Sequence, residues 1–427
     1  MKRIWEYAAV YIMVVYACTF LLIISAKIPR DLIQSNMEES AEYLNLHDSH
    51  FMYYQVEGVE SSIVDEVADA NILNIGYYFE ASHPLESVMA SRWYLNGGQN
   101  KSFLAAVKEE KDPTYNYLRY WHGSLAFIRP LLLFWNIQEI YRFHVILITV
   151  VLVSLLMILF RNRLRFECFA LLTAMISISL WTVPWCLEFT WMFLVMFVVS
   201  IIAVRQSVKK KEDSFFFMLF FITGMITIYL DFFTTETLTV LVPLLLVLRT
   251  RLRQGIEKNG LFSFKCCSLW GIGYVGMWAS KWLLASLVLN FNAFESIKGN
   301  MTPHLAVEQG MTTIAFLKDV LMRNIRCLFP VSFFPDALPI FFIISVALFV
   351  LLLMKNKPMM KTTGLFLILA SIPYVRLIII PHHSWFHYFF TYRAQAATVM
   401  GLCFAVIPAK NAFKRDKAAY FFVFRMK

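Results

Sequence analysis

Charged residues are scarce in this sequence: only 16% of its 427 residues are Asp, Glu, Lys or Arg, whereas 59% are hydrophobic. A soluble domain of this size needs more charge to cover its surface, so the composition excludes an ordinary water-soluble protein. Aromatic residues are plentiful in contrast, with 40 Phe, 19 Tyr and 11 Trp. Such rings suit the two interfaces of a bilayer, where one end of the ring is apolar and the other wet. The sequence therefore predicts an integral membrane protein.

The seven cysteines lack the spacing of a zinc ribbon or of a disulfide framework. No CxxC pair occurs, which removes the usual sequence argument for structural zinc or for a thiol redox centre. Six cysteines fall in or beside apolar runs and are expected to be small buried residues, whereas Cys327 lies in a predicted external loop. The sequence also shows no internal repeat and no low-complexity tract.

Ten apolar runs are predicted to cross the membrane, although several approach the lower length limit of about 17 residues. The first follows Lys2 and Arg3, and it is too long for the apolar region of a signal peptide, so we expect an uncleaved span. The predicted fold class is all-α, a polytopic membrane helical bundle with a helical extracytoplasmic cap. The ten runs are Ile4–Ile28, Phe143–Phe160, Cys168–Val183, Phe189–Val204, Phe215–Leu230, Thr237–Leu248, Cys266–Leu289, Leu338–Met354, Thr362–Ile380 and Tyr388–Ile407.

Basic residues gather in the connections that alternating spans place on one side of the membrane. Four such connections are Arg161–Arg165, Lys209–Lys211, Arg249–Arg253 and Lys355–Lys361. The positive-inside rule makes this side cytoplasmic and places both termini there. Because the basic residues are scattered over short loops, without a stripe that includes stacking aromatic rings, the net charge of +10 does not indicate nucleic-acid binding.

The predicted organisation places two long polar segments outside the membrane, and function is expected to concentrate in them because long ordered loops usually cover a site. We expect a multi-pass protein of a bacterial plasma membrane, with membrane lipids as its surroundings. The whole chain divides into a first span at 1–28, an extracytoplasmic loop or cap at 29–142, spans two to seven at 143–289, a second loop at 290–337, spans eight to ten at 338–408, and a basic interfacial tail at 409–427.

Three acids of the first loop are candidates for general-base chemistry: Asp65, Glu66 and Asp69. If the surrounding sequence is helical, Asp65 and Asp69 lie one turn apart on the same face. Two neighbouring carboxylates repel each other, and in a partly dry site this raises the pKa of one of them, as a general base requires. The alternative interpretation is the solvated face of a loop helix.

The same loop ends in YLRYWHGSLAFIRP, where Arg119 and His122 are candidate substrate-binding residues. Trp121 and the arginines also suit simple anchoring at the membrane interface. His122 is more suggestive of a site, because the neighbouring Gly123 permits a close approach of backbone.

Later external turns place further ionisable groups in apolar sequence. Glu188, Asp231 and Glu236 are such acids, and a charge at bilayer depth is costly enough to suggest a functional site. Lys281 lies within the seventh predicted span, where it either extends to the surface or neutralises a buried partner. Loop ends that reach water are the alternative explanation for Glu188.

The densest polar cluster is YVRLIIIPHHSWFHYFFTYR, which joins the ninth and tenth predicted spans. Guanidinium groups suit phosphate, and a pair of histidines four residues apart also suits metal ligation, although no third soft ligand follows at motif spacing. We favour a pocket for an anionic lipid headgroup. The candidate substrate-binding residues of this segment are Arg376, His382, His383, His387 and Arg393.

The layout resembles the C-type (GT-C) glycosyltransferases, polytopic membrane enzymes that use lipid-linked sugars. One branch of that family has large external loops between spans one and two and between spans seven and eight, and this sequence has its two long loops in the same intervals. The RYWHG and HYFFTYR segments also resemble uncharacterised bacterial multi-span membrane proteins. The resemblance implies transfer of a sugar from a polyprenyl-phosphate donor to an acceptor on the outer face.

The resemblance also implies roles for the candidate residues. An acid of the first loop (Asp65, Glu66 or Asp69) would be the base, and Arg376 and Arg393 would hold the lipid phosphate. The later acids would position substrate or bind a divalent cation, with Glu188 as the candidate metal ligand. An Asp-x-Asp pair is missing from the second external turn, which leaves metal dependence open.

Two other functions stay under consideration. A transporter or flippase of a lipid-linked or anionic solute would usually show hydropathy repeats, which this sequence lacks. A polymerase or ligase of surface polysaccharide would share the substrates but not the loop layout.

Overall fold

The computed structural model describes residues 2–46, 52–53, 58–256, 258–290, 292 and 310–409. It is 77% helical, and within the described residues seven helices are long and apolar enough to cross a membrane. The predicted all-α class and the multi-pass membrane character are therefore confirmed. The seven helices are α1 (Lys2–Ala26), α7 (Ile137–Arg161), α9 (Leu187–Val208), α10 (Asp213–Leu230), α12 (Gly260–Leu289), α15 (Leu338–Asn356) and α16 (Met360–Ile379).

Three of the ten predicted spans form shorter helices. One becomes α8 (Arg165–Ser177), which ends before the left-handed Ser179 and the 3-10 turn Leu180–Trp185. The second becomes α11 (Leu238–Arg253), so the basic residues predicted to form a connection lie inside its last turns. The third, Tyr388–Ile407, is divided into α18 (Tyr388–Thr391), a 3-10 turn and α19 (Ala396–Val406), and the short helix α17 (Pro381–Phe386) precedes it.

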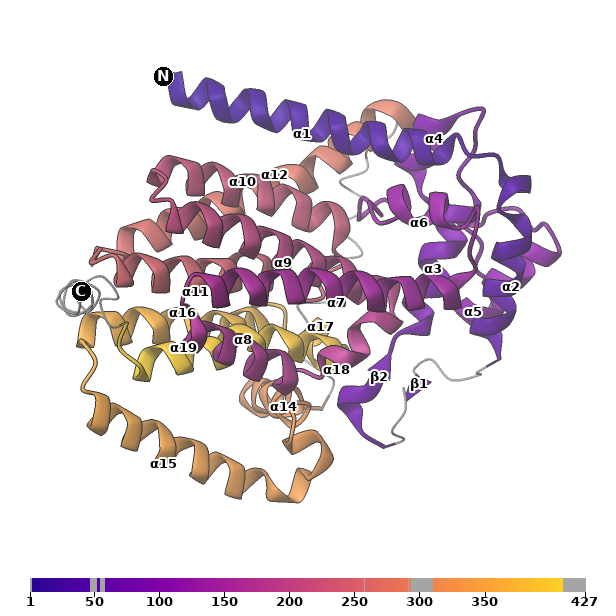
Figure 1. Cartoon of the computed structure of the whole chain (residues 1–427). Helices are drawn as coiled ribbons and strands as arrows, with labels where there is room; N and C mark the ends of the chain where they lie inside the picture. The colour runs from indigo at the N-terminus through magenta and orange to yellow at the C-terminus, as the bar shows by residue number, and fades with distance from the viewer. Residues whose placement is uncertain are drawn as a thin grey trace, which may run out of the picture.

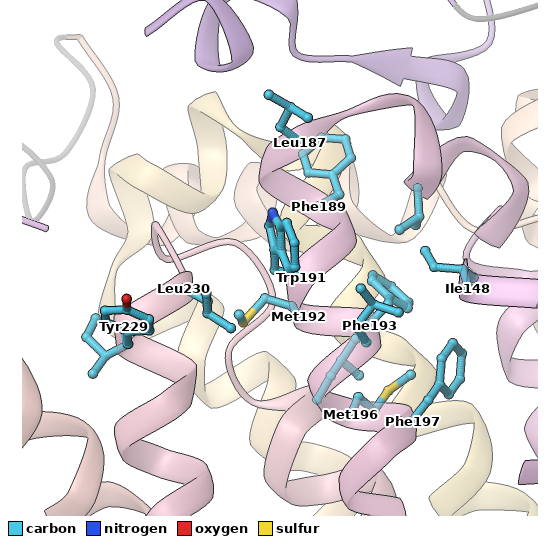
Figure 2. Close-up of a cluster of buried hydrophobic side chains, with 14 of the residues drawn as sticks. Ile148, Leu187, Phe189, Trp191, Met192, Phe193, Met196, Phe197, Tyr229 and Leu230 are labelled. Carbon is cyan, nitrogen blue, oxygen red and sulfur yellow. The ribbon is translucent and has the colours of Figure 1, made fainter. Parts of the chain in front are cut away.

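The core of the bundle lies around α9 and α11. Residues are buried on every side of α11, as expected for a uniformly apolar helix enclosed by others. Figure 2 shows the large side chains of α9, from Leu187 to Phe197, packed among neighbours that include Ile148 and Tyr229. Helices α10 and α12 approach closely at Gly224, where an added Cβ would lie 2.0 Å from the Trp270 carbonyl oxygen. Small residues are what such close membrane-helix contacts require.

One long helix lies at the margin of this core. Helix α15 has no fully buried residue, although Phe349 packs against the core and Asn356 donates to the Val406 carbonyl oxygen at 3.0 Å. In Figure 1 it lies at the lower edge, apart from the other long helices. Its sequence, from Leu338 to the cationic Lys355, is almost entirely apolar. An apolar helix with most of its surface exposed is stable in a bilayer, where the lipid chains surround it.

Small elements between α1 and α7 gather at one end of the long helices, on the right of Figure 1. Two short antiparallel strand pairs, β1 with β2 and β3 with β4, accompany them. The elements are α2 (Gln34–Asn45), β1 (Met52–Tyr53), β2 (Ile63–Val64), α3 (Glu66–Tyr77), α4 (Pro84–Ala90), β3 (Arg92–Trp93), α5 (Gln99–Lys108), β4 (Tyr115–Asn116) and α6 (Leu125–Leu131).

Lys281 of α12 attaches this group of small elements to the bundle. Its side chain is fully buried, and its Nζ donates to the carbonyl oxygens of Val88 at 2.8 Å and Met89 at 3.0 Å. These carbonyls end α4, and a cation is favourable at a helix C-terminus. Lys281 therefore does not reach the surface, and it pairs with no acid among the described residues.

The second predicted loop contributes α14 (Thr313–Arg326) and two 3-10 turns, Val331–Phe333 and Pro335–Ala337. Residues 293–309 of this loop and the predicted basic tail from residue 410 onward lie outside the described residues.

Candidate functional site

A cavity of about 280 Å³ lies where the small elements meet the ends of the long helices. Its walls come from one side of α3, the start of α5, the segment before α6, the first turn of α9, the turn after α10, and α17 with α18. Six of the predicted site residues line it: Asp65, Arg119, His122, Glu188, His383 and His387. Phe232, Phe386 and Phe390 add an apolar side to the cavity.

Asp65 is the N-cap of α3. Its Oδ1 accepts a hydrogen bond from the Ala68 amide at 2.9 Å, and the side chain is almost fully buried. Burial raises the pKa of Asp65 to about 7, with a smaller contribution from the Asp69 charge, while the Ala68 amide opposes the shift. A cavity carboxylate with such a pKa can gain or lose a proton near neutral pH.

Asp69 lies behind the cavity wall rather than on it. Its carboxylate accepts from the Leu187 amide at 2.9 Å and from the Tyr141 hydroxyl at 2.5 Å, with weaker contacts to Cys186 and Glu188. These amides open α9, and a helix N-terminus is a favourable place for an anion. Burial still raises the pKa of Asp69, to about 6. Asp69 thus joins α3 to α9.

Asp65 stands one residue before the first helical residue, Glu66, and has non-helical angles, φ −100° and ψ 81°. The Asp69 amide still donates to the Asp65 carbonyl oxygen at 3.2 Å, and the charges of the two acids interact. Glu66 is buried in the first turn of α3 and does not line the cavity. Burial, followed by the charges of Asp69 and Asp65, raises its pKa to about 8.

Three hydrogen-bond acceptors on the cavity walls are buried without a partner among the described residues. They are Asn71 Oδ1, His122 Nδ1 and Glu188 Oε2, from three separate segments. A buried polar atom without a hydrogen bond costs about 1–3 kcal/mol, so three in one cavity indicate a missing donor. Water or a ligand in the cavity can supply this donor.

His122 is held in a conformation that exposes this acceptor. Its φ is +52°, and its Nε2 lies 3.3 Å from the Tyr117 carbonyl oxygen, which assigns the ring proton to Nε2. Burial, and to a lesser extent Lys281, lowers the pKa of His122 to about 3, so the ring is neutral. The next residue, Gly123, donates to the Tyr229 carbonyl oxygen at 2.9 Å, and an added Cβ would collide with that oxygen at 2.4 Å.

Arg119 provides a cation on the cavity wall. Its guanidinium lies over the Tyr120 ring at 4.7 Å and donates to the Tyr117 hydroxyl at 2.8 Å. Its own carbonyl oxygen accepts from the indole nitrogens of Trp278 at 2.7 Å and Trp282 at 3.3 Å. These contacts fix both the backbone and the side chain of Arg119.

The histidine-rich segment contributes His383 and His387. Their ring centroids lie 4.7 Å apart, and the His387 ring stacks on Phe390 at 4.9 Å. His382 is not among the cavity residues, and its ring lies 6.2 Å from that of Trp385. Within the described part of the chain, no three residues among His, Cys, Asp and Glu are grouped to hold a metal ion.

Arg376 and Glu236 lie outside the cavity and pair with each other. Arg376 Nε donates to Glu236 Oε1 at 2.7 Å, and its other nitrogens donate to Ser384 and to the Phe233 carbonyl oxygen. Asp231 is also outside the cavity. It accepts from the Thr234 amide at 3.0 Å and hydroxyl at 2.6 Å, closing the turn after α10. Burial, then the Glu236 charge, raises the pKa of Asp231 to about 7.

Arg393 is fully buried behind the cavity. It donates to the Thr182 hydroxyl at 2.7 Å and to the Phe389 carbonyl oxygen at 3.0 Å, and it lies over the Phe189 ring at 4.5 Å. The two arginines expected to hold phosphate are thus both away from the cavity, and Arg119 is the arginine that lines it.

Several cavity residues escaped the sequence reasoning, among them Asn71, Gln99 and Tyr120. Helical spacing places four residues of α3 on one face: Ala68, Asn71, Ile72 and Ile75. This side of the cavity was therefore predictable once the start of the helix was known. Gln99 opens α5, and no pattern in the sequence connects it to the cavity.

Comparisons with known proteins find no match to this chain among family models, curated proteins or solved structures.

Proposed function

We propose that this protein transfers a sugar from a polyprenyl-phosphate donor to an acceptor. The proposal rests chiefly on the three unpartnered acceptors around the cavity, Asn71 Oδ1, His122 Nδ1 and Glu188 Oε2. A sugar offers several hydroxyl donors at once and would satisfy them. The aromatic side of the cavity suits the apolar faces of a sugar ring.

In this mechanism Asp65 is the general base. It takes the proton of the acceptor hydroxyl while the acceptor oxygen bonds to the anomeric carbon of the sugar. The bond from that carbon to the phosphate oxygen breaks, and the polyprenyl phosphate leaves with the electron pair. Arg119 stabilises the negative charge that develops on the leaving phosphate. This assigns to Arg119 the role that the family resemblance gives to Arg376 and Arg393.

The proposal also covers how the chain is placed across the membrane. Ten segments cross or enter the bilayer. Seven are the long helices, and the other three are the short helices α8 and α11 and the broken segment α17–α19. Both termini are cytoplasmic. The small elements then form an extracytoplasmic cap over the cavity, in a bacterial plasma membrane. A lipid-linked donor explains why a site for a polar sugar lies at the ends of apolar helices: the lipid stays in the bilayer while the sugar enters beneath the cap.

The test is a transfer assay in nanodiscs with a panel of polyprenyl-phosphate sugars, comparing wild type with Asp65→Asn. Asn caps a helix as well as Asp does, so the variant keeps α3 while it lacks the base. We expect the rate to fall about 10²- to 10⁴-fold. The wild-type rate should rise with pH through about 7, because Asp65 must be ionised to accept a proton.

Asp112→Asn is the matched control, since it makes the same change at an exposed residue of the same segment that does not line the cavity. Unchanged transfer by Asp65→Asn would remove Asp65 as the base. Movement of a labelled lipid across the bilayer without sugar transfer would replace the enzyme proposal by a transporter.

A further inference from the structure

A second cavity, of about 360 Å³, has α18 as a wall in common with the first. Phe390 of α18 lines the first cavity and Tyr388 lines the second, and residues two apart face opposite sides of a helix. The two cavities share none of their described lining residues, so the second is a separate site. It is lined by Gly58, Glu60, Asp319, Arg323, Arg326, Ser332, Pro335 and Tyr388.

Hydrogen bonds between segments distant in the sequence fix the walls of this second cavity. The Tyr388 hydroxyl donates to Glu60 Oε1 at 3.2 Å and joins α18 to the segment before β2. The Trp385 indole nitrogen donates to Asp319 Oδ2 at 2.6 Å and joins α17 to α14. A ligand that enters a cavity already held in shape loses less of its binding free energy to ordering of the protein.

Two of the four charged residues on the walls neutralise each other. Arg323 Nε donates to Asp319 Oδ2 at 2.9 Å, one helical turn away on α14. The Arg323 guanidinium also lies over the Trp385 ring at 4.2 Å. This pair is part of the wall and leaves no net charge for a ligand to balance.

The other two charges, Glu60 and Arg326, have opposite signs and stay separate. Glu60 accepts from the Tyr388 hydroxyl and, weakly, from the Cys327 thiol at 4.0 Å, and neither donor carries a positive charge. In the described part of the chain no salt bridge reaches Glu60 or Arg326. The cavity therefore presents one free anion and one free cation, which a ligand with both charges would satisfy together.

Ser332 adds a hydroxyl to this second cavity. Its Oγ accepts from the Ser61 hydroxyl at 3.0 Å, so its own proton is directed away from Ser61. A guanidinium and a hydroxyl together suit the oxygens of a phosphate group, whereas a carboxylate suits an ammonium group.

The second cavity also lies where the lipid-exposed helix α15 begins. Pro335 lines the cavity, and the apolar stretch that is long enough to cross a membrane starts at the same residue. Lipid chains that surround α15 carry their headgroups at the level of its ends. A phospholipid whose chains run along α15 can therefore place its headgroup in this cavity.

We propose that the second cavity binds a phosphoethanolamine group, with its phosphate at Arg326 and its ammonium at Glu60. This group has no net charge when it is a phosphodiester, which matches the balance of two acids and two arginines on the walls. The source is either the headgroup of phosphatidylethanolamine or soluble glycerophosphoethanolamine. The chemistry of recognition is the same for both.

The test measures the thermal unfolding midpoint of the full chain in detergent with short-chain phosphatidylethanolamine, short-chain phosphatidylglycerol or glycerophosphoethanolamine. We expect phosphatidylethanolamine to raise the midpoint and phosphatidylglycerol, which has the phosphate without the ammonium, to raise it much less. A shift with phosphatidylethanolamine alone would identify a lipid headgroup, and an equal shift with glycerophosphoethanolamine a soluble ligand.

Two variants test the two ends of the ligand separately. Arg326→Gln should weaken the apparent affinity for phosphatidylethanolamine about tenfold, as expected for the loss of one charge-assisted hydrogen bond. Lys318→Gln is the matched control, because Lys318 is an exposed cation of the same helix that does not line the cavity. Glu60→Gln keeps an acceptor for the Tyr388 hydroxyl but removes the charge, so the preference for phosphatidylethanolamine over phosphatidylglycerol should disappear.

Three results would overturn the proposal. The first is an equal response of the wild type to phosphatidylethanolamine and phosphatidylglycerol, since the site would then not recognise the ammonium. The second is the lack of any shift with phosphatidylethanolamine and glycerophosphoethanolamine. The third is an equal loss of affinity in Arg326→Gln and Lys318→Gln.

Discussion

At one end of the long helices, Glu167 is completely enclosed and pairs with Arg249 at 3.0 Å and with Arg253 at 3.2 Å. At the other end, Asp65 and Glu188 are enclosed almost as fully, yet neither has a salt bridge to a described residue. Both ends bury carboxylates in an apolar protein. They differ in whether the chain itself supplies the cation.

The difference separates structural acids from candidate functional ones. A buried charge is tolerated when it is paired and hydrogen-bonded, and an unpaired acid instead raises its pKa. Glu167 is paired with arginine side chains, whereas Asp65 has no such pair and its pKa is raised. Buried acids to which the protein supplies no cation are available to a ligand.

Glu236 shows that pairing matters more than location. It lies at the cavity end, but Arg376 neutralises it at 2.7 Å, and neither residue lines the cavity. The comparison therefore distinguishes two kinds of acid within one end of the bundle as well as between the two ends.

The largest expected effect comes from Glu167→Gln, which removes the salt bridges of Glu167 with Arg249 and Arg253. Arg249, at 1% exposure, would then hold a buried charge without a carboxylate. We expect the free energy of unfolding to fall by about 3 kcal/mol, as for other buried pairs that lose one partner. Unfolding in a denaturing detergent measures the change.

The control is the double variant Glu167→Leu, Arg249→Met. If the loss comes from an uncompensated charge, replacement of both partners by apolar side chains should recover most of the stability. A double variant as unstable as Glu167→Gln would mean that the pair acts through packing.

Much of the fold was readable from hydropathy, and the exceptions have physical reasons. Seven predicted spans are matched by helices long enough to cross, because bilayer thickness sets a minimum apolar length. The run Thr237–Leu248 was predicted to end before the basic cluster. Helix α11 instead continues to Arg253, because Glu167 and Asp213, distant in the sequence, neutralise its arginines.

The candidate site was readable in part. The neighbouring acids of the first loop pointed to Asp65, the adjacent Gly123 to His122 and the apolar surroundings to Glu188, and the structure places all three on one cavity. The same kinds of argument also pointed to Asp69 and Arg376, which are held by hydrogen bonds within the protein. Sequence identifies a buried charge, but only the fold shows whether a partner reaches it.

The next prediction tests the contrast between Glu167 and Asp65 through the pH dependence of stability. Burial raises the pKa of Asp65 to about 7 and that of Glu66 to about 8, above their ordinary values. The folded state then binds more protons than the unfolded state between about pH 4 and 8, so the free energy of unfolding falls as pH rises. Asp65→Asn should remove about 2 kcal/mol of the loss between pH 5 and pH 8.

Unfolding measured at both pH values, with Asp112→Asn as control, tests this prediction. An unchanged pH dependence in Asp65→Asn would show that Asp65 is ionised and stabilised in the folded protein, and the contrast with Glu167 would disappear.

The smallest effect tests whether Asp69 belongs with the structural acids. Tyr141→Phe removes the hydroxyl that donates to Asp69, while the amides of Leu187 and Glu188 continue to donate. We expect a loss of about 1 kcal/mol in the free energy of unfolding, the usual cost of one buried hydrogen bond. Transfer should change by only a few fold, because Asp69 positions α9 and does not line the cavity. A large loss of transfer with unchanged stability would instead place Asp69 in the chemistry, and the division between partnered and unpartnered acids would no longer predict function.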